Sequence, residues 1–224
     1  MNKLVIIRHG ESVWNKENRF TGWIDAPLSE TGIEQAREAG RNLKNQEFFF
    51  DLGFTSVLQR AYNTLNLILS EMSISIPIEK SWRLNERHYG ALQGLNKDEA
   101  RKQFGEEQVQ IWRRSYDVRP PKKTEEIKYE YDEIEEGEVP LAESLKDTET
   151  RLLPYWNERM APAIKEGKRV IISAHGNSIR ALIRNIEGIS GEEIASVEIP
   201  IGIPLVYELD DNLKVIDKYY LKAE

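Results

Sequence analysis

The sequence predicts an α/β fold, a three-layer sandwich in which a mostly parallel central sheet is flanked by helices. The first observation behind this prediction is that short apolar segments alternate with amphipathic ones, as strands alternate with crossover helices in such folds. The second is that two apolar segments, at 3–8 and 169–174, each run directly into a His-Gly pair. Neighbouring parallel strands would bring both pairs to one edge of the sheet, where the ligand crevice of an α/β fold lies.

The first half of the chain is expected to contribute three strands and two helices. Residues 3–8 form a short buried strand, because four consecutive residues in it are apolar. Thr31 and Glu34 have the spacing of a capping box and predict a helix that begins at about Thr31. The remaining elements of this half are a strand at 51–56, an amphipathic helix at 58–69 and a strand at 76–80.

The second half of the chain continues the alternation. Residues 97–114 predict one or two polar helices. The other expected elements are a helix marked by residues 145–156, a strand at 169–174 and a closing hairpin of residues 205–209 and 215–220. A chain of 224 residues is long enough to build one full hydrophobic core, so we expect a single domain over residues 1–224.

The segment 117–140 interrupts this pattern. It contains Pro120-Pro121 together with nine Asp or Glu and four Lys or Arg. One interpretation is a flexible acidic insertion that is simply solvated at the surface. The other is a mobile acidic flap beside an anion site, because loops of this kind often serve a binding site.

Composition narrows the classes of function. The absence of Cys excludes disulfides, thiolate metal sites and Cys nucleophiles, and 3 His make a His-rich metal cage unexpected. The net charge of -7 argues against binding nucleic acid or an anionic membrane, although a few Arg in one cleft can still hold a small anion. No apolar run approaches the ~20 residues that span a bilayer, and the N-terminus lacks the pattern of a signal peptide. A cytoplasmic protein is therefore expected.

Two histidines carry the strongest chemical signal. His9 lies in IIRHGES and His175 in ISAHGNS, each between an apolar strand and an expected helix start. Because helix N-termini attract anions, this edge of the sheet suits a phosphate. Arg8 directly precedes His9 and Arg60 begins its helix, so two guanidinium groups could hold phosphate oxygens there. Neither a Gly-x-Ser-x-Gly elbow nor a His-Glu-x-x-His motif is present, so a serine hydrolase or zinc protease is unsupported.

The segment LNERHYG at 84–90 concentrates an acid, a base, a cation and a phenol in one expected loop. Glu86 is the candidate for proton exchange with a reacting oxygen. Lys97 and the Arg113-Arg114 pair follow and could extend the positive surface. For Trp112-Arg113-Arg114, a solvated helix face remains the simpler interpretation.

These motifs together resemble the histidine phosphatase superfamily and, within it, the cofactor-dependent phosphoglycerate mutases. The short RHG match is shared by many phosphatases, whereas ERHYG followed by Lys97 and WRR is highly specific. The resemblance covers nearly the whole chain. The segments that carry it are RHGESVWNKENRFTGW (8–23), TSVLQRAYNTL (55–65), SWRLNERHYGALQGLNK (81–97), IWRRSYDV (111–118) and HGNSIRALI (175–183).

What the resemblance implies is interconversion of 3-phosphoglycerate and 2-phosphoglycerate, a reaction of glycolysis and gluconeogenesis. His9 would carry the phosphoryl group, Arg8, Arg60 and His175 would surround it, and Glu86 would be the general acid/base. Additional hydrogen bonds would come from Gly10, Asn15, Gly176 and Asn177. The positions that hold the substrate's carboxylate and distal phosphate are matched by Ser12, Thr21, Gly22, Arg87, His88, Tyr89, Lys97, Arg113 and Arg114. The implied cofactor is 2,3-bisphosphoglycerate as phosphoryl primer, with no metal.

The chain departs from longer mutases in two places. It ends at Glu224 without the tail that follows the last strand in many members, and the 117–140 insertion is shorter. Both regions lie near the active-site mouth in the family, so we expect some hydrolysis of the bisphosphate beside isomerisation. A bisphosphoglycerate synthase or phosphatase is the alternative within the superfamily, and a non-catalytic phospho-ligand module is the alternative outside it. A homo-oligomer is a further expectation.

Overall fold

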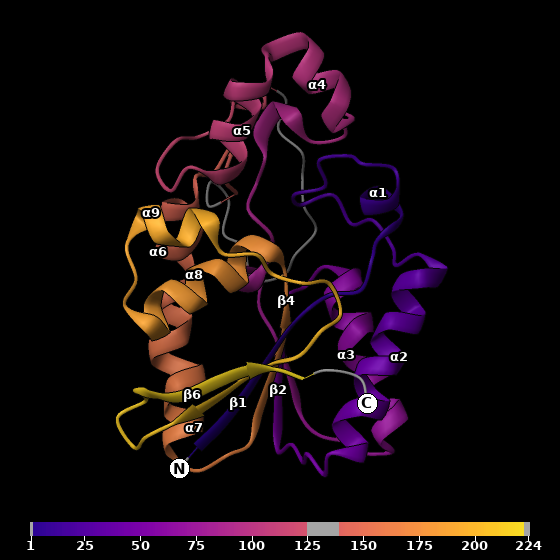
Figure 1. Ribbon diagram of the computed structural model, residues 1–224, viewed down its shortest axis with the longest axis vertical. Helices are drawn as coiled ribbons and strands as arrows, with labels where there is room; N and C mark the ends of the chain where they lie inside the picture. Colours follow the sequence, from indigo (N-terminus) through magenta and orange to yellow (C-terminus); the bar gives the residue numbers. More distant parts are fainter. Residues whose placement is uncertain (1, 125–138, 222–224) are drawn as a thin grey trace.

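The central element of the computed structural model is a six-stranded sheet with strand order β3-β2-β4-β1-β5-β6 (Figure 1). The structure describes residues 2–124 and 139–221. The interpretations of the 117–140 insertion depend on residues 125–138, which lie outside the described residues. The strands are β1 (Asn2–Arg8), β2 (Leu52–Thr55), β3 (Ile78–Lys80), β4 (Val170–Ala174), β5 (Leu205–Leu209) and β6 (Val215–Tyr220).

Four of the strands are parallel to one another. β1 pairs with β4, and β2 pairs with both β4 and β3, all in parallel. β5 joins β1 antiparallel and continues into β6, which confirms the predicted hairpin. In the β1–β4 register Arg8 lies opposite Ala174, so the two strands end at the same level. The residues that follow these strands, His9 and His175, therefore lie side by side.

Helices cover both faces of the sheet, which confirms the three-layer prediction (Figure 1). Successive strand residues point to opposite faces. Val5 and Ile7 therefore pack towards one face and Leu4 and Ile6 towards the other. The first face is covered by α2 (Glu30–Asn45) and α3 (Gln59–Met72). The second is covered by α6 (Leu145–Tyr155), the π-turn η3 (Trp156–Met160), α7 (Ala161–Lys165), α8 (Gly176–Glu187) and α9 (Gly191–Ser196).

A third group of short elements lies beyond the carboxyl ends of the parallel strands (Figure 1). These are α1 (Val13–Lys16), η1 (Trp82–Leu84), η2 (Gly90–Leu92), α4 (Lys97–Phe104) and α5 (Glu106–Arg114). The predicted polar region at 97–114 is thus two helices, and they meet at Gly105, whose φ of 86° is outside the helical range. Phe20, Leu92, Ala100 and Val109 form the small core of this group.

The second helix begins earlier than predicted. Ser29, not Thr31, is the N-cap of α2, and its Oγ accepts a hydrogen bond from the Gly32 amide at 3.0 Å. The reason is tertiary, because Ser29 is held by Glu11 through both its amide and its hydroxyl. Gly32 also lies against Gly10, where an added Cβ would come within 2.2 Å of the Gly32 oxygen. This close approach fixes the loop that follows β1. α1 is the helix start expected after the first His-Gly pair, whereas α7 and α9 were not predicted. β2 and β3 are shorter than the segments expected at 51–56 and 76–80.

Candidate active site

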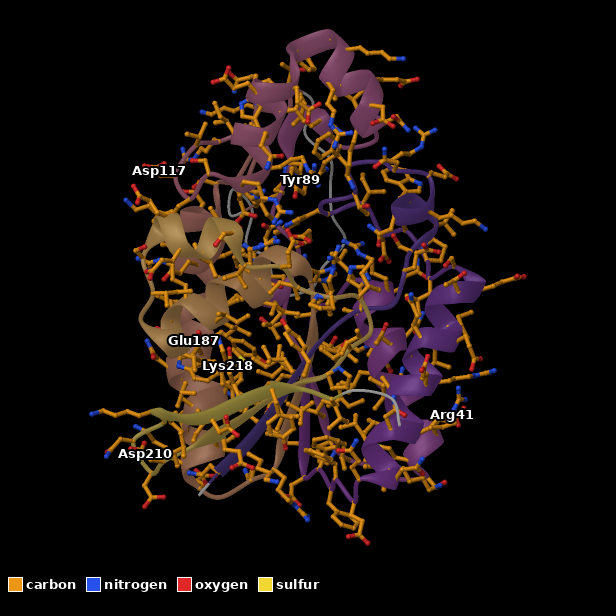
Figure 2. The ribbon with its side chains drawn as sticks, in the orientation of Figure 1. Arg41, Tyr89, Asp117, Glu187, Asp210 and Lys218 are labelled. Atoms are coloured by element: carbon orange, nitrogen blue, oxygen red, sulfur yellow. The ribbon has the colours of Figure 1, made fainter. Side chains whose placement is uncertain are left out.

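A pocket opens at the carboxyl ends of β1 and β4 and encloses about 380 Å³ of empty space, including its mouth. Tyr89, one of its lining residues, lies above the sheet and below α4 and α5 (Figure 2). Four lining side chains are cations and one is a carboxylate, so the pocket is suited to an anion. The lining residues are Arg8, His9, Asn15, Arg19, Phe20, Thr21, Gly22, Arg60, Glu86, Tyr89 and Lys97.

His9 is held in one tautomer at the end of β1. Its amide donates to the Ala174 oxygen at 3.0 Å, which continues the β1–β4 ladder. Its Nδ1 lies 2.7 Å from the Gly10 oxygen, and because a carbonyl only accepts, Nδ1 carries the hydrogen. Burial, with the charges of Arg60 and Arg8, lowers the pKa of His9 well below 6.5. Nε2 therefore keeps a free lone pair, as a nucleophile requires.

His175 packs directly against His9. The two rings meet edge to face with their centroids 5.0 Å apart, so the predicted convergence of the histidines is confirmed. His175 Nε2 lies 2.7 Å from Ser56 Oγ, while its Nδ1 is buried without a hydrogen-bond partner among the described residues. Burial and the charge of Arg60 lower the pKa of His175 well below its usual value. Both imidazoles are therefore neutral near pH 7.

Two arginines are oriented by backbone carbonyls beside the histidines. Arg60 is 1% exposed, and its two terminal nitrogens donate to the oxygens of Ile24 at 2.8 Å and Gly22 at 2.7 Å. Arg8 donates from Nη1 to the Ile199 oxygen at 3.0 Å, and its buried Nε has no partner among the described residues. Buried donors are normally satisfied. A phosphate oxygen would supply the acceptor that Arg8 Nε lacks.

Glu86 also lines the pocket and is fixed by several hydrogen bonds. Its Oε1 accepts hydrogen bonds from the Arg87 amide at 2.7 Å and from Asn177 Nδ2 at 2.8 Å and the Asn177 amide at 3.2 Å. The Glu86 backbone oxygen accepts from Trp23 Nε1 at 2.6 Å. Asn177 Nδ2 also donates to the Tyr89 hydroxyl at 3.1 Å. The first turn of α8 thus links Glu86 to the pocket wall.

A second group of cations surrounds Tyr89. Arg87 is fully buried, and its Nη2 donates to the Arg113 oxygen at 2.7 Å while Nε and Nη1 have no partner among the described residues. Burial lowers the pKa of Lys97 and of Arg113, whose charges also oppose each other. An incompletely paired Arg87, with Lys97 and Arg113 close to the same phenol, indicates a site for a second acidic group of the same ligand.

The structure does not bring every predicted residue to the pocket wall. Ser12 is buried as the N-cap of α1, where its amide donates a hydrogen bond to Asn15 Oδ1. His88 accepts from the Gly90 amide, and burial with the charges of Lys123 and Arg151 lowers its pKa to about 3. Ser12 and His88 therefore shape the backbone around the pocket. The other predicted residues outside the wall are Gly10, Arg87, Arg113, Arg114, His175, Gly176 and Asn177.

Several residues around the pocket were not singled out from the sequence. Arg19 and Phe20 line it, and Ser56 contacts His175. A polar residue directly after an apolar strand was the available signal for Ser56, which follows β2. Arg180 donates to the Val197 oxygen at 2.9 Å, and burial and the charge of Arg114 lower its pKa to about 10.

No three or more His, Cys, Asp or Glu of the described residues come together as a metal site would require. None of the helices in the described ranges has the length and apolar character to cross a membrane.

Residues 4–221 match the family described as Histidine phosphatase superfamily (branch 1). Similar solved structures include a mycobacterial glucosyl-3-phosphoglycerate phosphatase, which is 22% identical with a TM-score of 0.73 over 98% of this chain and 96% of that chain. An alpha-ribazole phosphatase from Shigella flexneri is 22% identical with a TM-score of 0.70, over 93% and 91%. YhfR from Bacillus stearothermophilus is 24% identical with a TM-score of 0.73, over 94% and 92%. At these identities the likeness concerns the fold.

Proposed function

Because this chain belongs to branch 1 of the histidine phosphatase superfamily, we propose that it transfers phosphoryl groups through a phosphohistidine at His9. The reaction proposed is the interconversion of 3-phosphoglycerate and 2-phosphoglycerate in the cytoplasm, primed by 2,3-bisphosphoglycerate and without a metal. The observation that carries this proposal is that a neutral His9, oriented arginines and the Glu86 carboxylate face one pocket beside a second cation group.

The first step forms the phosphoenzyme. His9 Nε2 attacks phosphorus, the nitrogen–phosphorus bond forms, and the bond from phosphorus to the ester oxygen breaks. Arg8 and Arg60 offset the negative charge on the three equatorial oxygens, and His175 packs beside them. Glu86 delivers a proton to the departing oxygen. Oε2 is the oxygen for this transfer, because the hydrogen bonds described above hold Oε1.

The second step reverses the first on a different hydroxyl. The phosphoenzyme meets 3-phosphoglycerate, Glu86 accepts the proton of the free hydroxyl, and that oxygen attacks phosphorus to give 2,3-bisphosphoglycerate. The bisphosphate then turns within the site and returns its other phosphoryl group to His9, which releases 2-phosphoglycerate. The bisphosphate primes the cycle by supplying the phosphoryl group that His9 must carry before it can react with 3-phosphoglycerate.

The second cation group favours a mutase over a simple phosphatase. A bisphosphate intermediate must stay bound while it turns, and water must be kept from phosphohistidine. Arg87, Lys97 and Arg113 supply positive charge that a substrate with one phosphate and no other acid would leave unpaired. A glycerate with a carboxylate and a second phosphate supplies negative charge that Lys97 meets at the pocket wall and that Arg87 and Arg113 stabilise from behind it.

Hydrolysis is the second candidate. The glucosyl-3-phosphoglycerate and alpha-ribazole proteins of similar fold are named phosphatases. In that reaction water takes the place of the acceptor hydroxyl, and Glu86 accepts its proton. The same phosphohistidine step precedes both outcomes.

One experiment separates these candidates. The protein is incubated with 3-phosphoglycerate, with and without 2,3-bisphosphoglycerate, while 2-phosphoglycerate and inorganic phosphate are measured in the same reaction. Primer-dependent formation of 2-phosphoglycerate in excess over phosphate supports the mutase. Release of phosphate without isomerisation supports the phosphatase. Label from the bisphosphate that is acid-labile and base-stable on the protein supports the phosphohistidine in either case.

A further inference from the structure

We propose that Arg151 and Glu143 are positioning residues that hold the backbone segment carrying Glu86 in register with the pocket. The proposal deepens the proposed function and rests on Glu86 being its proton-exchanging group. Arg151 lies on α6, on the face of the sheet opposite α2 and α3, and Glu143 lies just before that helix. Neither residue lines the pocket.

Arg151 binds the carbonyls of the segment that leads to Glu86. Its Nη1 donates to the Arg83 oxygen at 2.6 Å, and its Nη2 donates to the oxygens of Asn85 and Glu86, both at 3.0 Å. A longer bond of 3.3 Å joins Nη1 to the Trp82 oxygen. One guanidinium group thus contacts four carbonyls between residues 82 and 86. The Trp82 oxygen also accepts from the Asn85 amide at 2.9 Å. The Glu86 oxygen also accepts from Trp23 Nε1 at 2.6 Å.

Glu143 holds Arg151 and the far side of the same segment. Its Oε1 accepts from Arg151 Nε at 2.7 Å and its Oε2 accepts from Nη2 at 3.1 Å. The same Oε2 accepts from the His88 amide at 2.8 Å, and the Glu143 amide donates to the His88 oxygen at 2.8 Å. The pair therefore fixes the backbone on both sides of Glu86, at residues 85 and 88.

The position of the carboxylate depends on this backbone. Residues 85–89 lie between η1 and η2 in neither a helix nor a strand, yet Glu86, Arg87 and His88 are buried. The hydrogen bonds to Glu86 Oε1 come from Arg87 and Asn177, and the second of these reaches across from α8. A shift of about 1 Å at a reacting group can cost about 100-fold in rate. Small movements of the segment would therefore slow proton transfer more than they weaken substrate binding.

The chemistry of the pair makes the proposal specific. The side chains of Arg151 and Glu143 are 8% and 3% exposed, so the ion pair is shielded from water. A buried ion pair is weak evidence for stability, because desolvation offsets most of its attraction. The planar fork of Arg can reach several carbonyls and a carboxylate together, whereas the single ammonium of Lys cannot. Arg151→Lys keeps the charge but loses most of the hydrogen bonds.

The test compares two phosphoryl donors that differ in their need for an acid. The oxygen of glycerate leaves as a strong base and needs a proton, whereas p-nitrophenolate departs without one. Phosphoenzyme formation is measured in single turnovers with 2,3-bisphosphoglycerate and with p-nitrophenyl phosphate. For Arg151→Lys and Glu143→Gln we expect the rate of phosphoenzyme formation to fall at least tenfold with the bisphosphate. With p-nitrophenyl phosphate the same rate should fall about threefold or less. Equal losses with both donors would overturn the proposal and leave the pair with a role in folding alone.

A matched control uses another ion pair of α6, which joins Glu149 to Arg184 of α8. Arg184 donates to Glu149 Oε1 at 2.7 Å, and Glu149 is buried much like Glu143. Arg184→Lys should leave the ratio of the two rates unchanged. If this variant shifts the ratio as far as Arg151→Lys does, the effect belongs to α6 as a whole and the proposal fails.

A double-mutant cycle with Glu86→Gln completes the test. If Arg151 acts through Glu86, Arg151→Lys has little further effect on the bisphosphate rate once Glu86 is gone. If the fold-losses caused by Arg151→Lys and by Glu86→Gln instead multiply in the double variant, the proposal is wrong. Thermal unfolding monitors folding of each variant, and Glu143→Gln decides the question if Arg151→Lys does not fold. Failure of the proposed function itself looks different, since wild-type His9 would then accept no phosphoryl group from either donor.

Discussion

The imidazole rings of His9 and His175 meet with their centroids 5.0 Å apart and their planes inclined at 61°. Chain segments separated by most of the sequence are joined here because β1 and β4 are adjacent and end at the same level. Only His9 has its Nδ1 directed at a carbonyl, the Gly10 oxygen, and only His9 lines the pocket. The geometry therefore distinguishes the two histidines, and His9 is the one presented as a nucleophile.

The first prediction concerns His9→Ala. We expect loss of the phosphoenzyme and a fall in turnover on the order of 10⁴-fold or more, because no other group replaces the nucleophile. The fold should survive, since the neighbouring strands are held by their own ladder. Phosphoenzyme is measured with labelled 2,3-bisphosphoglycerate and folding by circular dichroism. Stable label at another residue of the variant would refute the assignment.

The second prediction concerns Glu86→Gln. The amide keeps the shape of the side chain but cannot exchange a proton, so single-turnover transfer to the glycerate hydroxyl should fall by about 10²–10⁴-fold. Binding of the bisphosphate should change much less. The measurement is a rapid-quench transfer rate beside a titration of bisphosphate affinity. A transfer rate within about threefold of wild type would remove Glu86 from the proton-exchanging role.

The third prediction concerns the pH dependence of stability. Burial and nearby cations lower the pKa of His88 to about 3, whereas in the unfolded chain it is about 6.5. Between these values the unfolded state binds a proton that the folded state does not, so the free energy of unfolding falls as the pH falls. The slope from one such group is at most about 1.4 kcal/mol per pH unit. Burial lowers the pKa of His9 and His175 in the same direction.

Urea unfolding between pH 6.5 and 5 measures this slope. His88→Asn offers a matched variant, because its side-chain oxygen can replace Nδ1 as acceptor for the Gly90 amide at 3.0 Å. We expect a shallower slope than in wild type, whatever the absolute stability of the variant. An unchanged slope would show that His88 does not remain neutral in the folded protein over this range.

The fourth prediction concerns metal ions. Arg8 and Arg60 are placed to offset the charge of a phosphoryl group, and the described residues hold no cluster of three potential metal ligands. We expect activity to be unchanged after treatment with EDTA and without added Mn²⁺. The assay is turnover of 3-phosphoglycerate before and after dialysis. Activity that disappears on chelation and returns with a divalent ion contradicts the metal-free proposal.

Much of this fold was predictable because its signals are local. The apolar runs that form β1 and β4, and the His-Gly pairs that follow them, are contiguous in the sequence. A parallel arrangement then follows from the alternation of strands and helices. The start of α2 could not be predicted in this way. Ser29 is the N-cap because Glu11, 18 residues away, accepts a hydrogen bond from its hydroxyl.

The supporting residues of the site could not be predicted either, because their contacts are also distant in sequence. Ser56 contacts His175 across 119 residues of sequence, and Arg151 reaches Glu86 across 65. The local signal for each residue is weak, since a Ser after a strand or an Arg on a helix is common. Their roles arise only when the sheet brings distant segments together. Glu86 was found because three other chemically active residues surround it in the chain.

The last prediction concerns how the second cation group recognises a glycerate. Lys97 is the first residue of α4, lines the pocket, and burial lowers its pKa. Replacing it by Gln removes a charge-assisted hydrogen bond of about 1.5–3 kcal/mol, which corresponds to about 10–150-fold in kcat/KM. We expect this loss with 2,3-bisphosphoglycerate but about threefold or less with glycerol 3-phosphate, which has neither a carboxylate nor a second phosphate. Lys102→Gln, an exposed site on the same helix, should change neither value. Equal losses with both esters would place Lys97 at the transferred phosphate, and the case for a site that binds a second acidic group would then rest on Arg87 and Arg113.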